Sequence, residues 1–417
     1  MAARGIALGV DLGTSGVRVA ALDAAGRMAG LGTAPLADAR APEGWWAALR
    51  RALAALADQA DLAGLRAVAV GGTSGTLLPV DAAGRPLAAA SLYSDQAEPE
   101  AVRAVERCAP AGSPARGATS PLARALAWLE LPGLARLLHQ ADWITGRLLG
   151  CYRWSDGNNA LKTGYNAAAA RWPPWLAAAG MPLALLPEVR PAGTPLGAMD
   201  AALARSLGLP PGLLVVAGTT DGCAAFLAAG AARPGEAVTS LGSTLVLKLA
   251  SEAPVTAPDF GVYSHRLQGL WLAGGASNSG GAALARHFDG PALARLSARL
   301  DPGRASPLDY YPLPGRGERF PIADAGLAAR ETPRPDDDLA FLHGLLEGIA
   351  RIEAAGYRRL VELGASPLVS VRTVGGGARN AAWTAIRARV LGVPVCRAAA
   401  EEAAVGLAGL ALRQALR

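Results

Sequence analysis

The chain has 417 residues, 51% of them apolar, and a formal net charge of +6. This length exceeds one ordinary hydrophobic core and predicts two domains. The mild charge and the scattered arginines argue against a nucleic-acid partner, and the lack of eighteen consecutive uncharged apolar residues argues against a membrane span.

Both the cysteines and the first residues favour a cytoplasmic protein. The sequence enters a strand-like run by residue 6, which leaves no room for a signal peptide. The cysteines are far apart and lack metal-site spacing, as expected of free thiols in a reducing compartment. They are Cys108, Cys151, Cys223 and Cys396.

A hairpin opens the chain. Residues 6–23 read as two strands joined by a turn that contains Gly13, Thr14 and Ser15. Glycine permits close backbone approach and small hydroxyl side chains add donors, so such a turn suits a phosphate group. Asp11 ends the first strand, where a carboxylate can hold Mg²⁺ through water. The alternative for Asp11 is a turn cap.

Helices and strands then alternate. We expect a helix over 44–60, a strand over 65–70, a mostly helical stretch over 121–149, and a buried strand over 213–217. Such alternation predicts a layered α/β fold.

Two polar residues at predicted strand ends, Ser74 and Asp95, are candidates for hydrogen bonds to a polyol. Each also fits an ordinary turn. Residues 155–159 line a pocket or form an Asx-rich loop, and the loop is the preferred interpretation.

Asp221 stands between the strand at 213–217 and a helix of small residues. This is the carboxyl end of a strand, the usual ligand crevice of α/β sheets. A carboxylate there can accept the proton of a sugar hydroxyl as its oxygen attacks a phosphate. An N-cap role is the alternative, because helices select aspartate at that position.

The hairpin pattern recurs after residues 231–235, which mark the expected domain boundary. Residues 237–249 again read as two strands, and their turn contains Gly242, Ser243 and Thr244. Two such turns facing one another would hold a triphosphate between two related lobes. The duplication therefore predicts an ATP-dependent phosphotransferase.

A long amphipathic helix is expected over 337–363, followed by a strand over 369–374 and the turn 375–377. This turn offers bare backbone to a flat ring or a phosphate, and Asn380 and Trp383 follow at helical spacing. The glycine signatures of Rossmann sites and P-loops are missing, as is the GxSxG of a hydrolase.

Five segments together resemble motifs of the FGGY carbohydrate kinases, in that family's order and over nearly the whole chain. They are 9–18, 217–222, 241–244, 274–281 and 375–380. The resemblance implies two ribonuclease-H-like lobes of the actin and hexokinase type with ATP in the cleft between them. The sugar-binding lobe would span 1–230 and the nucleotide lobe 231–417, with a last helix able to pack back on the first lobe.

The resemblance also implies roles for single residues. Asp221 would be the general base and Asp11 would organise Mg²⁺. The phosphates of ATP would contact the two turns, and the nucleoside would lie on the third. These cofactor-binding residues are Gly13, Thr14, Ser15, Gly242, Ser243, Thr244, Gly376, Gly377, Asn380 and Trp383.

The sugar suggested by the resemblance is D-ribulose. The chain is short for the family, residues 72–76 replace a common Ser-x-Gln, and 93–97 keep Asp95 but lack the arginine that often follows it. These features look most like the short D-ribulose kinase branch, in which Ser74, Asp95 and Asp221 would contact the ketose. D-Xylulose, another pentulose or a polyol is the alternative, and a non-kinase ATPase clamp is the distant one. A monomer or a homodimer fits equally.

Overall fold

The computed structural model describes residues 3–417, which divide into two compact units. The first unit runs to Ala228 and also contains His265–Gln268 and Glu402–Arg417. The second comprises Ala229–Ser264 and Gly269–Glu401. The division lies two residues before the expected boundary at residue 230, and the C-terminal residues return to the first unit.

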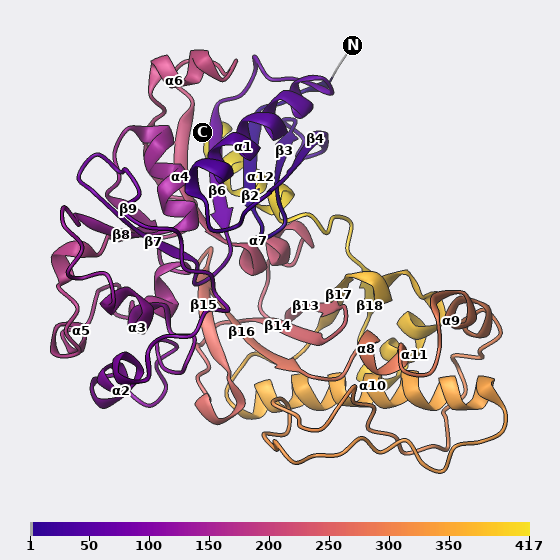
Figure 1. The fold of residues 1–417 in the computed structure, drawn as a ribbon. Coiled ribbons are helices and arrows are strands. Elements are labelled where there is room, and N and C mark those ends of the chain that lie inside the picture. The colour runs from indigo at the N-terminus through magenta and orange to yellow at the C-terminus, as the bar shows by residue number, and fades with distance from the viewer. Residues whose placement is uncertain (1–2) are drawn as a thin grey trace. The chain divides into compact units, whose positions relative to one another are not determined.

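A six-stranded sheet forms the centre of the first unit, in the order β11-β12-β6-β2-β3-β4; Figure 1 labels β6, β2, β3 and β4. The strands β2 and β3 are the antiparallel arms of the first predicted hairpin, and β6 lies parallel to β2. The strands are β2 (Ala7–Leu12), β3 (Gly16–Leu22), β4 (Met28–Pro35), β6 (Ala67–Gly72), β11 (Pro195–Ala198) and β12 (Leu214–Thr220). Its main covering helices are α1 (Pro42–Ala57), α4 (Gln140–Leu149), α7 (Asp221–Ala228) and α12 (Ala403–Ala415).

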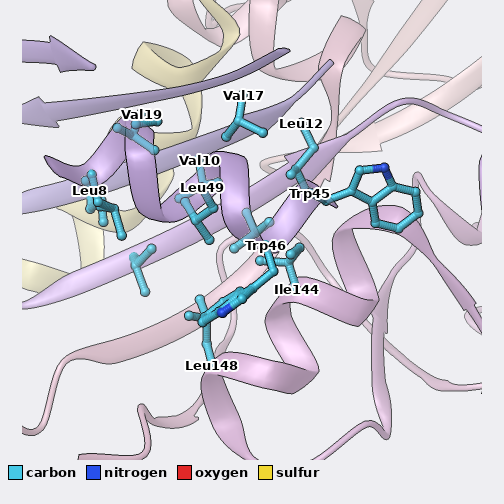
Figure 2. Close-up of a cluster of buried hydrophobic side chains, with 14 of the residues drawn as sticks. Leu8, Val10, Leu12, Val17, Val19, Trp45, Trp46, Leu49, Ile144 and Leu148 are labelled. Atoms are coloured by element: carbon cyan, nitrogen blue, oxygen red, sulfur yellow. The ribbon is translucent and has the colours of Figure 1, made fainter. Parts of the chain in front are cut away.

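The two faces of this sheet carry residues of different size. On one face, large side chains of β2 and β3 pack against Trp45, Trp46 and Leu49 of α1 and against α4 (Figure 2). On the other face, alanines of β2 and β6 meet α7 and α12. A Cβ on Gly9 would lie 2.0 Å from the carbonyl oxygen of Ala404, so only glycine lets α12 approach β2 this closely.

The second unit repeats the arrangement of five strands of the first, and the sixth strand lies at the opposite edge of its sheet. Its sheet has the order β15-β16-β14-β13-β17-β18, although β15 belongs to this unit only as far as Ser264. The hairpin β13–β14 is antiparallel and β17 lies parallel to β13, as β6 does to β2. The duplication predicted from the two hairpins therefore extends to the sheets around them. The strands are β13 (Glu236–Leu241), β14 (Leu245–Ser251), β15 (Tyr263–Leu267), β16 (Leu270–Ser277), β17 (Ser370–Val374) and β18 (Val395–Arg397).

The core of the second unit lies between its sheet and two helices, α10 (Asp338–Glu362) and α11 (Ala381–Leu391). The predicted long helix is confirmed, and Asp337 caps it by accepting hydrogen bonds from Leu339 and Ala340. The smaller helices of this unit are α8 (Gly281–Leu284), α9 (Gly290–Ser297), and the 3-10 turns η3 (Pro258–Phe260) and η4 (Gly376–Arg379).

The helical prediction for residues 121–149 is wrong in its middle. The structure has α3 (Pro121–Leu126), then β8 (Arg136–His139) and then α4. β8 pairs antiparallel with β7 (Leu77–Val80), so a long-range partner gives these apolar residues a strand conformation.

Short elements complete the first unit. They are β1 (Ala3–Arg4), β5 (Ala60–Asp61), β9 (Trp154–Asp156), β10 (Glu188–Arg190), α2 (Pro99–Cys108), α5 (Trp175–Ala178), α6 (Ala201–Ser206), η1 (Ala160–Thr163) and η2 (Leu183–Leu185). Within residues 3–417, every helix is too short or too polar to cross a membrane.

Candidate active site

A pocket of about 470 Å³ opens in the first unit at the ends of β2, β6 and β12. It brings together the first glycine turn, both predicted carboxylates and Ser74. It also contains residues that the sequence did not single out, Arg18, Thr73, Tyr93 and Lys162. The full lining is Asp11, Gly13, Thr14, Ser15, Arg18, Thr73, Ser74, Tyr93, Lys162 and Asp221.

Asp11 lies on β2 just before the turn, and only 6% of its surface is exposed. Its Oδ1 is buried without a hydrogen-bond partner. Burial raises the pKa of this carboxyl to about 7, and the charges of Asp221 and Glu402 add to the effect while Arg18 opposes it. An unsatisfied buried carboxylate oxygen beside a phosphate-type turn fits a divalent cation such as Mg²⁺.

Because the Asp11 carboxylate is buried, we expect its negative charge to lower the free energy of unfolding of the metal-free protein. The folded pKa lies above the ordinary value of 3.8, so the contribution of this group to stability is complete below pH 3.8 and is lost as pH rises through about 7. Asp11→Asn should therefore stabilise the metal-free protein at pH 8, by at most about 4 kcal/mol, and have little effect at pH 4.

Thermal unfolding in EDTA at several pH values measures this difference. Asp336→Asn, at an exposed loop position, is the matched control. A stability difference between Asp11→Asn and the wild type that does not change with pH would contradict the assignment.

Asp221 begins α7 directly after β12 and lines the same pocket. Its Oδ1 accepts a hydrogen bond of 2.6 Å from the backbone N–H of Gly222. Its charge raises the pKa of Asp11, which places the two carboxylates in one electrostatic environment. The structure therefore joins two acids that are 210 positions apart in the sequence.

Ser74 and Asp95, both predicted to contact substrate, have different surroundings. Ser74 lines the pocket, and its hydroxyl is buried without a hydrogen-bond partner. Asp95 is not part of the lining. Arg40 pairs with both of its carboxylate oxygens at 2.5 and 2.6 Å. This hydrogen bonding lowers the pKa of Asp95 to about 2.

The chain lacks the arginine that the sequence resemblance leads one to expect just after Asp95. Arg40, 55 positions earlier in the sequence, supplies a guanidinium to this carboxylate. The same carboxylate accepts hydrogen bonds from the Leu92 N–H and the Ser91 hydroxyl. Since Tyr93 lies in the pocket lining, these contacts fix the loop that carries it.

A second pocket, of about 680 Å³, lies within the second unit. It gathers most of the predicted nucleotide residues, namely Gly242, Ser243, Gly376, Gly377, Asn380 and Trp383. Thr244 is not part of its lining. Apolar residues that the sequence analysis missed, among them Phe288 and Leu293, form much of its wall. An apolar pocket with a few polar groups suits an adenine ring.

Hydrogen bonds hold the glycine turns that border this pocket. The N–H of Gly281 donates to the carbonyl of Gly242 at 2.8 Å, which ties the start of α8 to the second phosphate-type turn. Asn380 caps α11 by accepting from the N–H of Trp383, and its amide donates to Ser297. The indole N–H of Trp383 donates to Leu346. Asn380 and Trp383 therefore have structural roles as well as positions in the lining.

Gly376 and Gly377 differ in what a side chain would meet. A Cβ on Gly377 would lie 2.5 Å from the side chain of Leu241, so this glycine serves packing. A Cβ on Gly376 would meet no atom within 4 Å. The pocket wall at Gly376 is consequently open to a ligand.

We expect Gly376→Leu to weaken nucleotide binding without unfolding the protein, because the new side chain fills open space that a nucleotide needs. The apparent affinity for ATP should fall by at least roughly tenfold, the effect of losing about 1.4 kcal/mol. Calorimetric titration with an ATP analogue measures it. Gly315→Leu, also in open space but outside the lining, is the control and should bind normally. Equal affinities for the two variants would contradict the prediction.

Comparisons with known proteins agree with this arrangement. Residues 237–415 match the model of the C-terminal domain of the FGGY family of carbohydrate kinases. The xylulose kinase of Streptomyces coelicolor is 30% identical over 417 residues, covering 94% of this chain and 84% of that protein. The xylulose kinase of Escherichia coli K12 is 28% identical, covering 92% of this chain and 84% of that protein.

Solved structures extend the likeness to the fold. A structure described as a xyloylose kinase from Brucella ovis is 25% identical and has a TM-score of 0.83, covering 98% of this chain and 90% of that one. The two-lobed α/β fold of the actin and hexokinase type, expected from the sequence, is confirmed.

Proposed function

The chain belongs to the FGGY family of carbohydrate kinases, and from that premise we propose that it transfers the γ-phosphate of MgATP to the terminal hydroxyl of a small ketose, D-ribulose first. The observation that carries the proposal is the first-unit pocket, where Asp11, Asp221 and the glycine turn share one lining with an unsatisfied serine hydroxyl.

Each group has a chemical task in this proposal. Asp221 accepts the proton of the attacking hydroxyl, which raises the nucleophilicity of that oxygen. Asp11 would hold the metal that accompanies the triphosphate, and a bound Mg²⁺ would supply positive charge beside the transferred phosphoryl group. The N–H groups and hydroxyls of the turn at 13–15 donate hydrogen bonds to phosphate oxygens.

The second-unit pocket would hold the nucleoside, with the turn at Gly242 and Ser243 on its phosphates. Transfer then requires the γ-phosphate to reach the alcohol at Asp221. Because water is a competing acceptor, the reaction also requires exclusion of solvent when both substrates are bound.

D-Ribulose is preferred because residues 72–76 and 93–97 resemble the short ribulose-kinase branch. The Ser74 hydroxyl supports a ketose in general, since a donor and acceptor without a protein partner in the pocket suits a ketose oxygen. D-Xylulose is the second candidate, favoured by the two relatives named as xylulose kinases.

A coupled assay of ADP release tests the proposal. The purified protein is supplied with ATP, Mg²⁺ and one of D-ribulose, D-xylulose, L-ribulose, L-xylulose, ribitol or glycerol, with EDTA as the metal-free control. We expect kcat/KM to be highest for D-ribulose. A higher kcat/KM for D-xylulose would make D-xylulose the preferred substrate in place of D-ribulose. No ADP release with any ketose would overturn the proposal.

A further inference from the structure

We propose that Lys162 is a substrate-binding residue, whose ammonium donates hydrogen bonds to oxygens of the sugar. This inference deepens the proposed function and rests on it. Lys162 lines the first-unit pocket together with Asp221, Ser74 and Tyr93. It is one of only two lysines in a chain in which Lys and Arg together number 40.

Asp221 acts electrostatically on two other charged groups of the pocket. Asp11 is influenced by Asp221, Arg18 and Glu402. Lys162 is influenced by Asp221, Arg124 and Tyr93. Asp221 is the charge common to both sets, so the proposed base acts electrostatically on both Asp11 and Lys162.

Asp11 and Lys162 offer a ligand different chemistry. Asp11 stands beside the glycine turn, where the metal and the phosphates are proposed to bind. Lys162 lines the same pocket as Asp221, so the other oxygens of a sugar whose reacting hydroxyl lies at Asp221 share that pocket with the ammonium. A lysine ammonium has three donors and no acceptor, so it binds carbonyl and hydroxyl oxygens through their lone pairs.

A buried polar framework fixes the backbone around Lys162. The lysine lies on η1, and the neighbouring Thr163 hydroxyl is 2.9 Å from Nε2 of His139. Nδ1 of His139 is 2.6 Å from Oδ2 of Asp142. Residues 155–159, which were expected to form an ordinary Asx-rich loop, are therefore the first part of a hydrogen-bonded segment that also carries Lys162.

The same support reaches the strand that precedes Asp221. Asn158 donates to the hydroxyl of Thr219 on β12 at 2.9 Å, and the amide of Asn159 donates to Asp156 at 2.5 Å. Thr219 stands two residues before Asp221. Lys162 and the proposed base are thus carried by segments that are hydrogen-bonded to one another.

The surroundings of the ammonium leave a role for a ligand. Burial lowers the pKa of Lys162, and the charge of the Asp221 carboxylate opposes this effect. A Cβ on Gly75 would lie 3.7 Å from Cδ of Lys162, so the aliphatic stem passes close to that glycine. A desolvated ammonium at a pocket wall gains most from a ligand oxygen that replaces lost water.

Nuclear magnetic resonance of protein labelled with [¹³Cε]-lysine tests the contact directly. The two lysines give two Cε signals, and Lys162→Arg identifies one by deleting it while keeping the charge. We expect D-ribulose, added with a non-hydrolysable ATP analogue, to shift the Lys162 signal and leave Lys248, on β14 of the other unit, unmoved.

Kinetics provide the second measurement. Lys162→Met keeps the length of the stem but removes the donors, so KM for the sugar should rise roughly ten- to hundredfold, as expected for a lost charged hydrogen bond. KM for ATP should remain unchanged. Thermal unfolding of the variant confirms that it is folded.

The outcomes separate this inference from the proposed function. Turnover of a ketose with an unmoved Lys162 signal, or with an unchanged sugar KM in Lys162→Met, would overturn the inference and leave the function standing. No turnover of any ketose, with a Lys162 signal that responds to the sugar acid D-ribonate, would overturn the proposal that the substrate is a ketose. It would support the substrate-binding role of Lys162. No response to either ligand would overturn both.

Discussion

Replacing Asp221 by asparagine is expected to lower kcat for sugar phosphorylation by at least about a hundredfold, the effect typical of removing a general base. The asparagine has the same size and still begins α7, so the fold and nucleotide binding should be retained. The substitution also removes a like charge near Asp11. Since the charge of Asp221 raises the pKa of Asp11, that pKa should fall in the variant. Steady-state kinetics and calorimetric titration with an ATP analogue measure the two properties separately.

The control addresses the alternative that Asp221 only begins a helix. Asp200 caps α6 in the same unit by accepting a 2.7 Å hydrogen bond from the Leu203 N–H. Asp200→Asn makes the same chemical change at a helix start outside the pocket and should leave kcat unaltered. If both variants turned over at the wild-type rate, Asp221 would be a helix-starting residue without a role as base.

The largest effect on stability is expected at the ion pair between Arg387 and Glu353. Nε and Nη2 of Arg387 lie 2.5 and 2.6 Å from the carboxylate oxygens, and both side chains are almost wholly inaccessible to solvent. Arg387→Met leaves the Glu353 carboxylate buried without its partner. We expect a loss of about 3–5 kcal/mol in the free energy of unfolding.

A double variant distinguishes the pair from the packing around it. Glu353→Leu combined with Arg387→Met removes both charges and should recover most of the loss, because an apolar pair avoids the cost of desolvating ions. Arg103→Met breaks the exposed pair with Glu100 and should cost less than about 1 kcal/mol. Urea denaturation measures all three. A double variant as unstable as Arg387→Met would contradict the account.

This ion pair also explains how the second unit fixes its two glycine turns. Glu353 accepts from the Thr239 hydroxyl on β13, and Arg387 donates to the Thr373 hydroxyl on β17. Thr239 and Thr373 are register partners in the sheet. The turns at Gly242 and Gly375 follow these strands, so the buried ion pair fixes the two strand ends from which both turns extend.

The sequence predicted those parts of the fold that depend on local pattern. The two hairpins, the helix α10 and the strand before Asp221 were expected from periodicity and turn residues, and the structure contains all of them. The strand β8 was missed because a short apolar run suits either conformation, and its partner β7 lies more than fifty residues away.

Candidate site residues were likewise predicted where the signal is local and missed where it depends on distant contacts. Asp11 and Asp221 could be found because each ends a strand beside small residues. Lys162 could not, since its place depends on contacts such as Asn158 to Thr219, 61 positions apart. Its signal in the sequence was rarity alone, as one of two lysines among many arginines. Arg40 was missed because its partner Asp95 comes from a different loop.

The return of α12 to the first unit has a consequence for biosynthesis. This helix covers β2 and β6, whose ends border the first-unit pocket, yet it follows the whole second unit in the sequence. Domains ordinarily fold as the ribosome delivers them, beginning at the N-terminus. Here the sheet that is made first lacks one of its covering layers until residues 403–415 have been made, so the first unit cannot complete its packing before the second unit has been synthesised.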